Sequence, residues 1–146
     1  MKIEVKIDET CPHPKVVIYT DHITDEVNSI VKRLSEESPQ LLAGFREDRL
    51  EILRQPEIVR IFASGGKVYA QTRKGEYILR LRLYELEDRL DRKLFVRISN
   101  SEIINLTLTE GFDLSLTGTI RVALAGGIIT YVSRRYVSKI KQVLGI

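Results

Sequence analysis

The sequence predicts a mainly β, α+β fold with short helices, preceded by a small strand–strand–helix extension. Most apolar residues lie in short segments that alternate apolar and polar positions with a period of two, as strands do. Turn residues such as Gly65-Gly66 and Lys74-Gly75 separate these segments, and glycine suits the positive φ of hairpin turns. Helical spacing of apolar residues is confined to three segments, so helices are expected to be the minor part of the fold.

Residues 1–40 are expected to form the extension. Met1–Ile7 alternates in the manner of a half-buried strand, and Val16–Tyr19 predicts a second short strand after a proline-containing loop. Apolar residues between Ile23 and Leu34 fall on one helical face, and either Thr24 or Asp21 could cap that helix. A connector at residues 35–39 follows. A unit this small has too little core to fold alone, so we expect it to pack on the rest of the chain or on a partner.

Residues 41–146 are expected to form the main domain, in which short strands are joined by turns. Apolar spacing over Leu81–Leu90 predicts a helix in the middle of this domain. The clearest hairpin joins Thr119–Ala125 to Ile128–Val132, and a final helix is expected to stop at Gly145. The remaining predicted strands are Leu41–Phe45, Leu50–Leu53, Ile58–Ala63, Lys67–Thr72, Glu76–Leu79 and Leu94–Ile98.

The strand Leu94–Ile98 leads into a short polar turn, Ser99-Asn100-Ser101. Short polar side chains compete with backbone hydrogen bonding and favour turns. A strand that delivers Arg97 beside an exposed turn of this kind suits contacts with phosphates and base edges. The alternatives are an ordinary polar turn, a salt bridge from Arg97 to a nearby acid, and a cap or turn lock at Asn105.

A second cationic stretch opens the final helix. Ser133 is expected to be the N-cap, which places Arg134 and Arg135 in the first turn. Positive charge there opposes the helix dipole, so an anionic partner explains the two arginines better than folding does, although a solvated pair is the plain alternative. The apolar residues expected to pack inward are Tyr136, Val137, Ile140, Val143 and Leu144.

The net charge of +3 is unevenly distributed along the chain. Residues 1–58 contain 8 Lys and Arg against 12 Asp and Glu, whereas residues 59–146 contain 15 against 8. The basic excess therefore lies entirely in the later part of the chain. Such an asymmetry is typical of a protein that uses one region on phosphates, because phosphate contacts supply most non-specific affinity for nucleic acid. Chance variation in a Lys- and Arg-rich composition is the alternative.

The chain also carries a set of residues and strands that occur together, in this order, in one family: Phe95, Arg97, Ser101, Asn105, the strand pair Thr119–Ala125 and Ile128–Val132, and then Ser133-Arg134-Arg135-Tyr136-Val137. Through them the region from Pro56 to Ile146 resembles the LytTR DNA-binding domain. The resemblance implies an elongated, mostly β fold that binds promoter DNA through loops and not through a recognition helix. It also implies contacts in successive major grooves and with the intervening backbone, usually on paired direct repeats.

The resemblance implies roles for individual residues. Asn100 and Arg135 match positions at which the family makes base or near-base contacts, and the turn Ser64–Lys67 matches its other groove-entering loop. Ser99 stands where a histidine is common, and the turn near Gly66 lacks a larger polar side chain, so Lys67 is expected to meet phosphate. The residues expected to contact the DNA backbone are Lys67, Arg97, Ser99, Ser101, Ser133, Arg134 and Lys139.

Other classes of site find little support. The lone Cys11 forms no internal disulfide, and with His13 and His22 it provides too few ligands at the wrong spacing for a zinc site. Glu85 and Glu87 point to different faces of a helix, so a shared catalytic site is not expected. We expect no catalytic residues, no metal and no small-molecule cofactor. The absence of a membrane span and of a signal peptide predicts a cytoplasmic protein.

The sequence leaves the partners open. Double-stranded DNA is the first candidate, with two copies of the chain meeting on it as a homodimer. The chain has no room for a phosphorylation-receiver domain, so control is expected through abundance, oligomerisation or a sequestering protein. A membrane-bound inhibitor or another regulatory protein could use the N-terminal extension. The alternative function is a protein-interaction module in which the acidic N-terminal part binds and the β domain is scaffold. RNA binding is disfavoured because the sequence has no tryptophan and no clustered aromatic residues.

Overall fold

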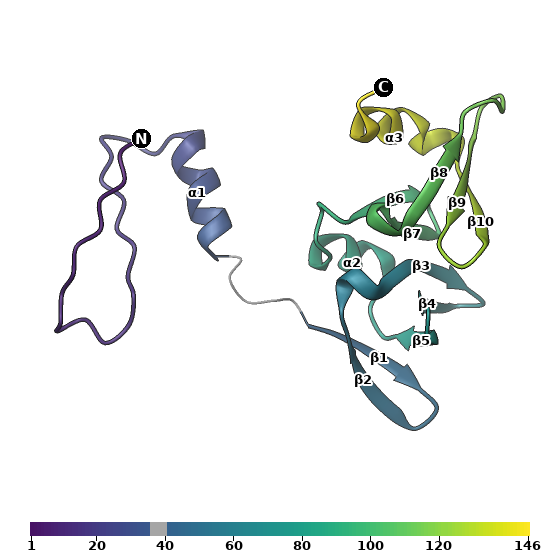
Figure 1. Ribbon diagram of the computed structural model, residues 1–146, viewed down its shortest axis with the longest axis horizontal. Helices are drawn as coiled ribbons and strands as arrows, with labels where there is room; N and C mark the ends of the chain where they lie inside the picture. Colours follow the sequence, from purple (N-terminus) through teal and green to yellow (C-terminus); the bar gives the residue numbers. More distant parts are fainter. Residues whose placement is uncertain (36–40) are drawn as a thin grey trace. The chain divides into compact units, whose positions relative to one another are not determined.

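The computed structural model describes residues 1–35 and 41–146, and the chain divides into two compact units, Met1–Pro39 and Gln40–Ile146. Figure 1 shows the elements of each unit as a ribbon. The predicted connector lies outside the described residues from residue 36 onward. Each unit is therefore described by itself.

The first unit contains one helix, α1 (Asp25–Ser35). The choice of cap is resolved, because the backbone N–H of Val27 donates to Oγ1 of Thr24 at 3.2 Å. The structure assigns no strand to residues 1–7 or 16–19, so the two strands predicted there are not formed. The apolar side chains of those segments are exposed, Ile3 by 82% and Ile7 by 93%. Alternation of apolar and polar residues alone does not hold two isolated strands together without a surface on which to bury one face.

The second unit contains two antiparallel sheets (Figure 1), and the mainly β fold with short helices is confirmed. The seven-stranded sheet has the order β2-β1-β5-β4-β3-β7-β6, and the three-stranded sheet has the order β10-β9-β8. The strands are β1 (Leu42–Arg46), β2 (Arg49–Leu53), β3 (Ile58–Ser64), β4 (Lys67–Thr72), β5 (Gly75–Leu79), β6 (Phe95–Ser99), β7 (Glu102–Asn105), β8 (Thr109–Asp113), β9 (Ile120–Leu124) and β10 (Ile128–Val132). The strands and the hairpin predicted for this region are confirmed to within a few residues.

The helices of the second unit are short. They are the α-helices α2 (Leu83–Arg89) and α3 (Val137–Leu144) and the 3₁₀-helices η1 (Gln55–Glu57), η2 (Leu106–Leu108) and η3 (Arg134–Tyr136). The final helix begins differently from the prediction, because η3 precedes α3 and the side chain of Ser133 makes no capping hydrogen bond. Its predicted end is confirmed, since Gly145 adopts a φ of 72° at the C-cap of α3.

Two apolar cores hold the second unit together. The first packs α2, through Leu86, against one face of the seven-stranded sheet, where Ile61 and Ala70 are fully buried. The second lies among β6, β7, the three-stranded sheet and α3, and it contains Ile98 and Ile140. Val143 departs from the prediction, because its side chain is 48% exposed. Because the second core contains Ile98 at the end of β6 and Val132 at the end of β10, it holds the turn after β6 near the segment that leads into α3. The candidate site lies at these two segments.

Candidate nucleic-acid interface

Three loops of the second unit are tied together by hydrogen bonds. We call them the glycine turn (Ser64–Lys67), the serine turn (Ser99–Ser101) and the arginine segment (Ser133–Arg135). The backbone N–H of Ala63, just before the glycine turn, donates to the carbonyl of Ser101 at 2.8 Å. The backbone N–H of Ser133 donates to the carbonyl of Ile98 at 2.9 Å, just before the serine turn. Loops that are about 35 residues apart in the sequence therefore adjoin one another on one surface, which we call the three-loop face.

The serine turn has a defined shape. The β6–β7 pairing shifts register between Arg97 and Ser99, and Ser99 then pairs with Glu102 across the turn. Oγ of Ser99 accepts the backbone N–H of Ser101 at 3.2 Å and lies 3.3 Å from Oγ of Ser101. Asn100 at the tip is exposed, and its Oδ1 accepts the hydroxyl of Tyr136 at 3.3 Å. The tip of the turn is thus bonded directly to η3.

Arg97 lies behind this turn and not on its surface. Its Nε donates to the carbonyl of Ser99 at 2.9 Å, and its Nη2 donates to the carbonyl of Asn100 at 2.6 Å. Its Nη1 forms an ion pair with Oε1 of Glu87 in α2, and its side chain is only 16% exposed. The salt bridge considered for Arg97 in the sequence is therefore present. Its guanidinium group fixes the backbone of the serine turn from behind.

The arginine segment presents its two guanidinium groups to the surface. Arg134 and Arg135 are both exposed. The guanidinium of Arg134 packs on Gly118, where an added Cβ would lie 3.2 Å from Nη2. Among the described residues, no hydrogen bond or ion pair is formed by the side chain of Arg135. Arg135 therefore carries an accessible positive charge next to the serine turn.

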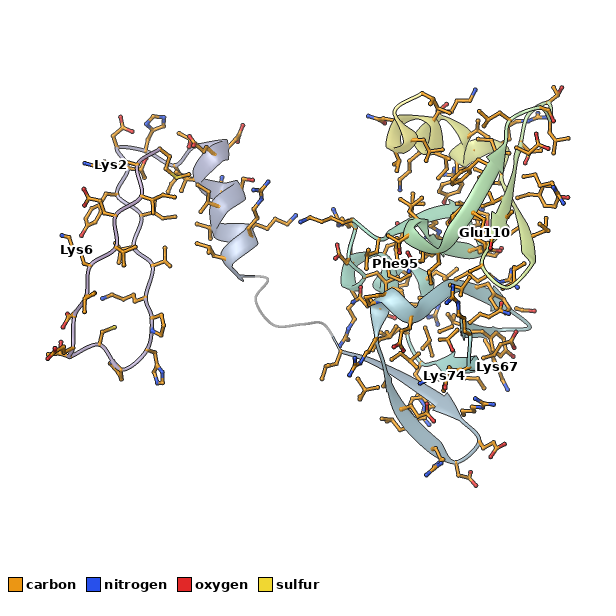
Figure 2. All side chains as sticks on the ribbon, viewed as in Figure 1. Lys2, Lys6, Lys67, Lys74, Phe95 and Glu110 are labelled. Atoms are coloured by element: carbon orange, nitrogen blue, oxygen red, sulfur yellow. The ribbon has the colours of Figure 1, made fainter. Side chains whose placement is uncertain are left out.

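An open cleft of about 430 Å³ joins the glycine turn to the serine turn. Gly66 and Lys67 line it on one side and Asn100 on the other. Lys67 lies at the periphery of the second unit in Figure 2. Lys139 is separated from this group, because it lines another cleft together with Glu87 and Asp88. The structure thus brings together the predicted site residues of the three loops and places Lys139 apart, beside acidic side chains.

A buried carboxylate lies directly beneath the three-loop face. Glu102 follows the serine turn and is 8% exposed. Its Oε1 accepts the hydroxyl of Thr130 at 2.9 Å and lies 3.5 Å from Nη1 of Arg60. Its Oε2 has no hydrogen-bond partner among the described residues. Burial raises the pKa of Glu102, and the bonds from Thr130 and Arg60 only partly oppose that shift.

Asn105 has the structural role that was weighed as the alternative. It is fully buried, and its Nδ2 donates to the carbonyl of Ile58 at 2.9 Å. Its Oδ1 accepts the backbone N–H of Thr107 at 2.9 Å and so caps η2. Asn105 therefore locks β7 to β3 and is not part of the three-loop face.

Several residues that build this face were not predicted from the sequence. Tyr136 was assigned to the core, and its hydroxyl contact with Asn100 joins residues 36 positions apart. Glu87 was considered as a catalytic candidate and set aside, yet its spacing from Leu83 and Leu90 places it on the inner side of α2 and could have predicted its contact with Arg97. Arg82 and Tyr84, at the start of α2, line the cleft between the two turns. No local pattern marks them.

Two further properties of the described residues bear on function. They contain no helix that is long and apolar enough to cross a membrane. They also contain no group of three or more His, Cys, Asp or Glu side chains that could hold a metal ion.

Comparisons with known proteins give a consistent result. The model of the LytTr DNA-binding domain matches residues 48–145. A protein of Staphylococcus aureus strain bovine RF122 / ET3-1, described as an HTH-type transcriptional regulator, is 33% identical over 147 residues, which cover 100% of this chain and 99% of that protein. The corresponding protein of strain NCTC 8325 / PS 47 is 32% identical over the same shares.

The solved structure of a LytTr DNA-binding domain from a response regulator of Bacillus cereus superposes with a TM-score of 0.70. It is 20% identical in sequence, and the match covers 73% of this chain and 97% of that chain. The fold of that domain is therefore shared with the second unit.

Proposed function

Because this chain belongs to the LytTR family of DNA-binding domains, we propose that it recognises promoter DNA in a sequence-specific manner through the three-loop face. The chain is a DNA-binding transcriptional regulator. In the proposed complex, loops enter successive major grooves of direct-repeat sites and no recognition helix is used. Major grooves expose a distinct donor and acceptor pattern for each base pair, which loops can read as well as helices.

The observation that carries this proposal is the pair of backbone hydrogen bonds that ties the three loops together. The backbone N–H of Ala63 donates to Ser101 and that of Ser133 donates to Ile98, so the three loops cannot move apart without breaking these two bonds. A preorganised set of amide, hydroxyl and guanidinium groups on one surface loses little conformational entropy on binding. The excess of Lys and Arg over Asp and Glu in residues 59–146 also supports the proposal, because positive charge attracts the phosphates of DNA.

Each residue of the face has a proposed role. Arg135 reads a guanine edge, and Asn100 contacts a base or the adjacent sugar–phosphate. Arg97 positions the serine turn in place of contacting the backbone directly, because its guanidinium is already engaged with Glu87 and two carbonyls. The residues proposed to contact the DNA backbone are Lys67, Ser99, Ser101, Ser133, Arg134 and, outside the three-loop face, Lys139.

The test is DNA binding by Arg135→Ala across a set of site variants that differ at single base pairs. A good bidentate pair to guanine discriminates by about 1–3 kcal/mol, so the variant should lose roughly 5- to 150-fold in affinity for the best site and much less for a site changed at the contacted base pair. Mobility shifts at two salt concentrations measure both effects. Arg49→Ala is the matched control, since this exposed arginine lies on β2, at the opposite edge of the sheet from β6.

The results separate the outcomes. Equal loss of affinity on every site would move Arg135 to the phosphate-contacting class. No loss on any site would remove Arg135 from the interface and contradict the proposed recognition. Failure of the wild-type chain to bind any duplex in a salt-dependent manner would overturn the proposal as a whole.

The first unit has a separate proposed role in binding a partner protein. Its exposed apolar side chains, Ile3, Val5 and Ile7 among them, have no surface within the unit to cover them. A second copy of the chain, or a regulatory protein such as a membrane-bound inhibitor, would cover them in this proposal. The alternative in which the whole protein is only an interaction module predicts no salt-dependent affinity for duplex DNA.

A further inference from the structure

The cleft between the glycine turn and the serine turn contains two residues with no assigned role. Arg82 precedes α2 and Tyr84 lies in its first turn, and both line the cleft together with Lys67 and Asn100. Tyr84 is 64% exposed, so its side chain is accessible at the cleft. Arg82 and Tyr84 are both exposed, so neither fills a core, and both are accessible to a ligand at the cleft.

The charge of the cleft comes from side chains that are not already paired. Arg97 also lines it, but its guanidinium is neutralised by Glu87. Arg82 and Lys67 are both exposed, and among the described residues neither side chain forms an ion pair. The nearby carboxylate of Glu85 accepts the backbone N–H of Arg82 at 3.2 Å. The cleft is therefore lined by two exposed cationic residues, Arg82 and Lys67, together with Tyr84 and Asn100.

From this arrangement we infer that the cleft binds a phosphate of the DNA backbone, held by Arg82 and Lys67 and by a hydrogen bond from the Tyr84 hydroxyl. The inference rests on the proposed function, because it follows from the position of the cleft between two loops that enter grooves. Two major-groove contacts on one duplex are separated by sugar–phosphate backbone, and the strand that runs between them crosses the cleft. Arginine, lysine and tyrosine are among the side chains that commonly contact phosphate oxygens.

In this proposal Arg82 and Tyr84 fix the position of the protein on the duplex and add affinity, but they do not read the base sequence. Phosphate contacts carry no base information, so their loss weakens binding on all sites alike. Each phosphate neutralised by a cation contributes about 0.9 to the slope of log affinity against log salt. Arg82 should therefore be visible in the salt slope, whereas Tyr84, which is neutral, should not.

The experiment measures the affinity of the full chain for its best site and for single-base variants at several salt concentrations. Arg82→Gln is expected to weaken binding about tenfold on every site, which corresponds to a lost charge-assisted hydrogen bond, and to reduce the salt slope by about 0.9. Tyr84→Phe is expected to weaken binding about threefold, with the slope unchanged, because it removes only a hydroxyl donor. Thermal melting of each variant checks that the fold is intact.

The matched control is Arg73→Gln. Arg73 is an exposed arginine that follows β4, whereas the cleft lies at the other end of that strand, where Lys67 begins it. Arg73→Gln removes the same charge as Arg82→Gln but should leave both the affinity and the salt slope unchanged. A salt slope reduced equally by Arg73→Gln and Arg82→Gln would show a diffuse charge effect and overturn the assigned cleft.

The two proposals fail in different ways. If Arg82→Gln keeps the wild-type affinity and slope while Arg135→Ala loses affinity, the phosphate site is overturned and the three-loop face stands. If Arg82→Gln loses affinity on only one base-pair variant, Arg82 reads a base and the phosphate assignment is overturned. If the wild-type chain binds no duplex, the proposed function itself has failed.

Discussion

Asn100 and Asn105 show how the environment of a residue decides its role. The two asparagines are five positions apart, and a local pattern does not distinguish them. Asn100 is exposed at the tip of the serine turn, whereas Asn105 is fully buried and bonded to Ile58 and Thr107. A buried amide whose bonding groups are all paired stabilises the fold, and an exposed one remains accessible to a ligand.

The buried carboxylate of Glu102 makes the stability of the protein depend on pH. Burial raises its pKa in the folded protein above the ordinary value of 4.5. The stability that protonated Glu102 contributes is therefore complete below that value and is lost as the pH rises through the raised folded-state pKa. Glu102→Gln removes this titration. The melting temperature of the wild type relative to Glu102→Gln is expected to fall as the pH rises from about 4.5 through the raised pKa of the folded protein.

The matched control for this prediction is Glu110→Gln, which changes an exposed carboxylate on β8 (Figure 2). Both variants and the wild type would be melted at the same series of pH values. A constant difference between wild type and Glu102→Gln at all of them would show that Glu102 does not titrate differently on folding. The control separates this local effect from the loss of one negative charge.

The role of Arg97 could not be read from its neighbours in the sequence. Its ion-pair partner, Glu87, lies ten residues earlier in a different element, and the two meet only because α2 packs beside β6. The accessible groups, Asn100 and Arg135, were identified from local turn and helix-start signals together with the family resemblance. Residue contacts that depend on tertiary packing, such as the bond between Tyr136 and Asn100, were not predictable from local signals.

At the scale of elements, α2 acts as a brace behind the serine turn. Glu87 holds Arg97, which in turn holds two carbonyls of the turn. If Glu87 braces the serine turn in this way, Glu87→Gln should weaken DNA binding by about three- to tenfold. This loss is expected even though the substitution removes a negative charge near the DNA phosphates. Arg97→Gln should weaken binding similarly, and the double variant should be no worse than either single one. Affinity titrations of the four proteins form the required cycle.

Asp88→Asn is the control for this cycle, because Asp88 is the next residue, is exposed and pairs with Arg92 instead of Arg97. It removes the same charge and should leave affinity unchanged or slightly higher. Stronger binding by Glu87→Gln would contradict the bracing role. It would mean that Arg97, once released, contacts phosphate directly.

The strands were predicted well in one unit and not in the other, although the sequence pattern is the same in both. In the second unit every segment predicted as a strand has a ladder partner, as Lys67–Thr72 has between β3 and β5, although Leu50 and Ile52 of β2 remain exposed. The segment at residues 1–7 alternates as regularly, but its apolar side chains remain exposed. Periodicity reports which face a strand would bury, and only the rest of the fold decides whether that burial occurs.

At the scale of the whole molecule, a regulator whose relatives are described as HTH-type reads DNA, in this proposal, without a helix-turn-helix. In the described residues, α1 and α2 are separated by five strands and α2 and α3 by five more, so no two α-helices follow one another across a short turn. The three-loop face instead combines the ends of strands from two sheets. The sheet order, in which β7 lies between β3 and β6, makes this combination possible.

The division into two units leads to a prediction about the isolated second unit. Both apolar cores and all three loops lie in residues 41–146, so a chain restricted to these residues is expected to melt cooperatively. On a DNA fragment with a single half-site, its affinity should remain within about threefold of the full chain and its salt slope should be unchanged, because every proposed phosphate contact is retained. Mobility shifts and thermal melting measure these properties.

A fragment with two direct repeats then isolates the contribution of the first unit. If residues 1–40 hold a second copy of the chain, the full chain binds the paired site more cooperatively than the shortened one, because linked sites raise the effective concentration. Equal cooperativity would assign the exposed apolar residues of the first unit to another protein partner. Loss of single-site binding in the shortened chain would contradict the prediction, since it would place part of the DNA-contacting surface in residues 1–40.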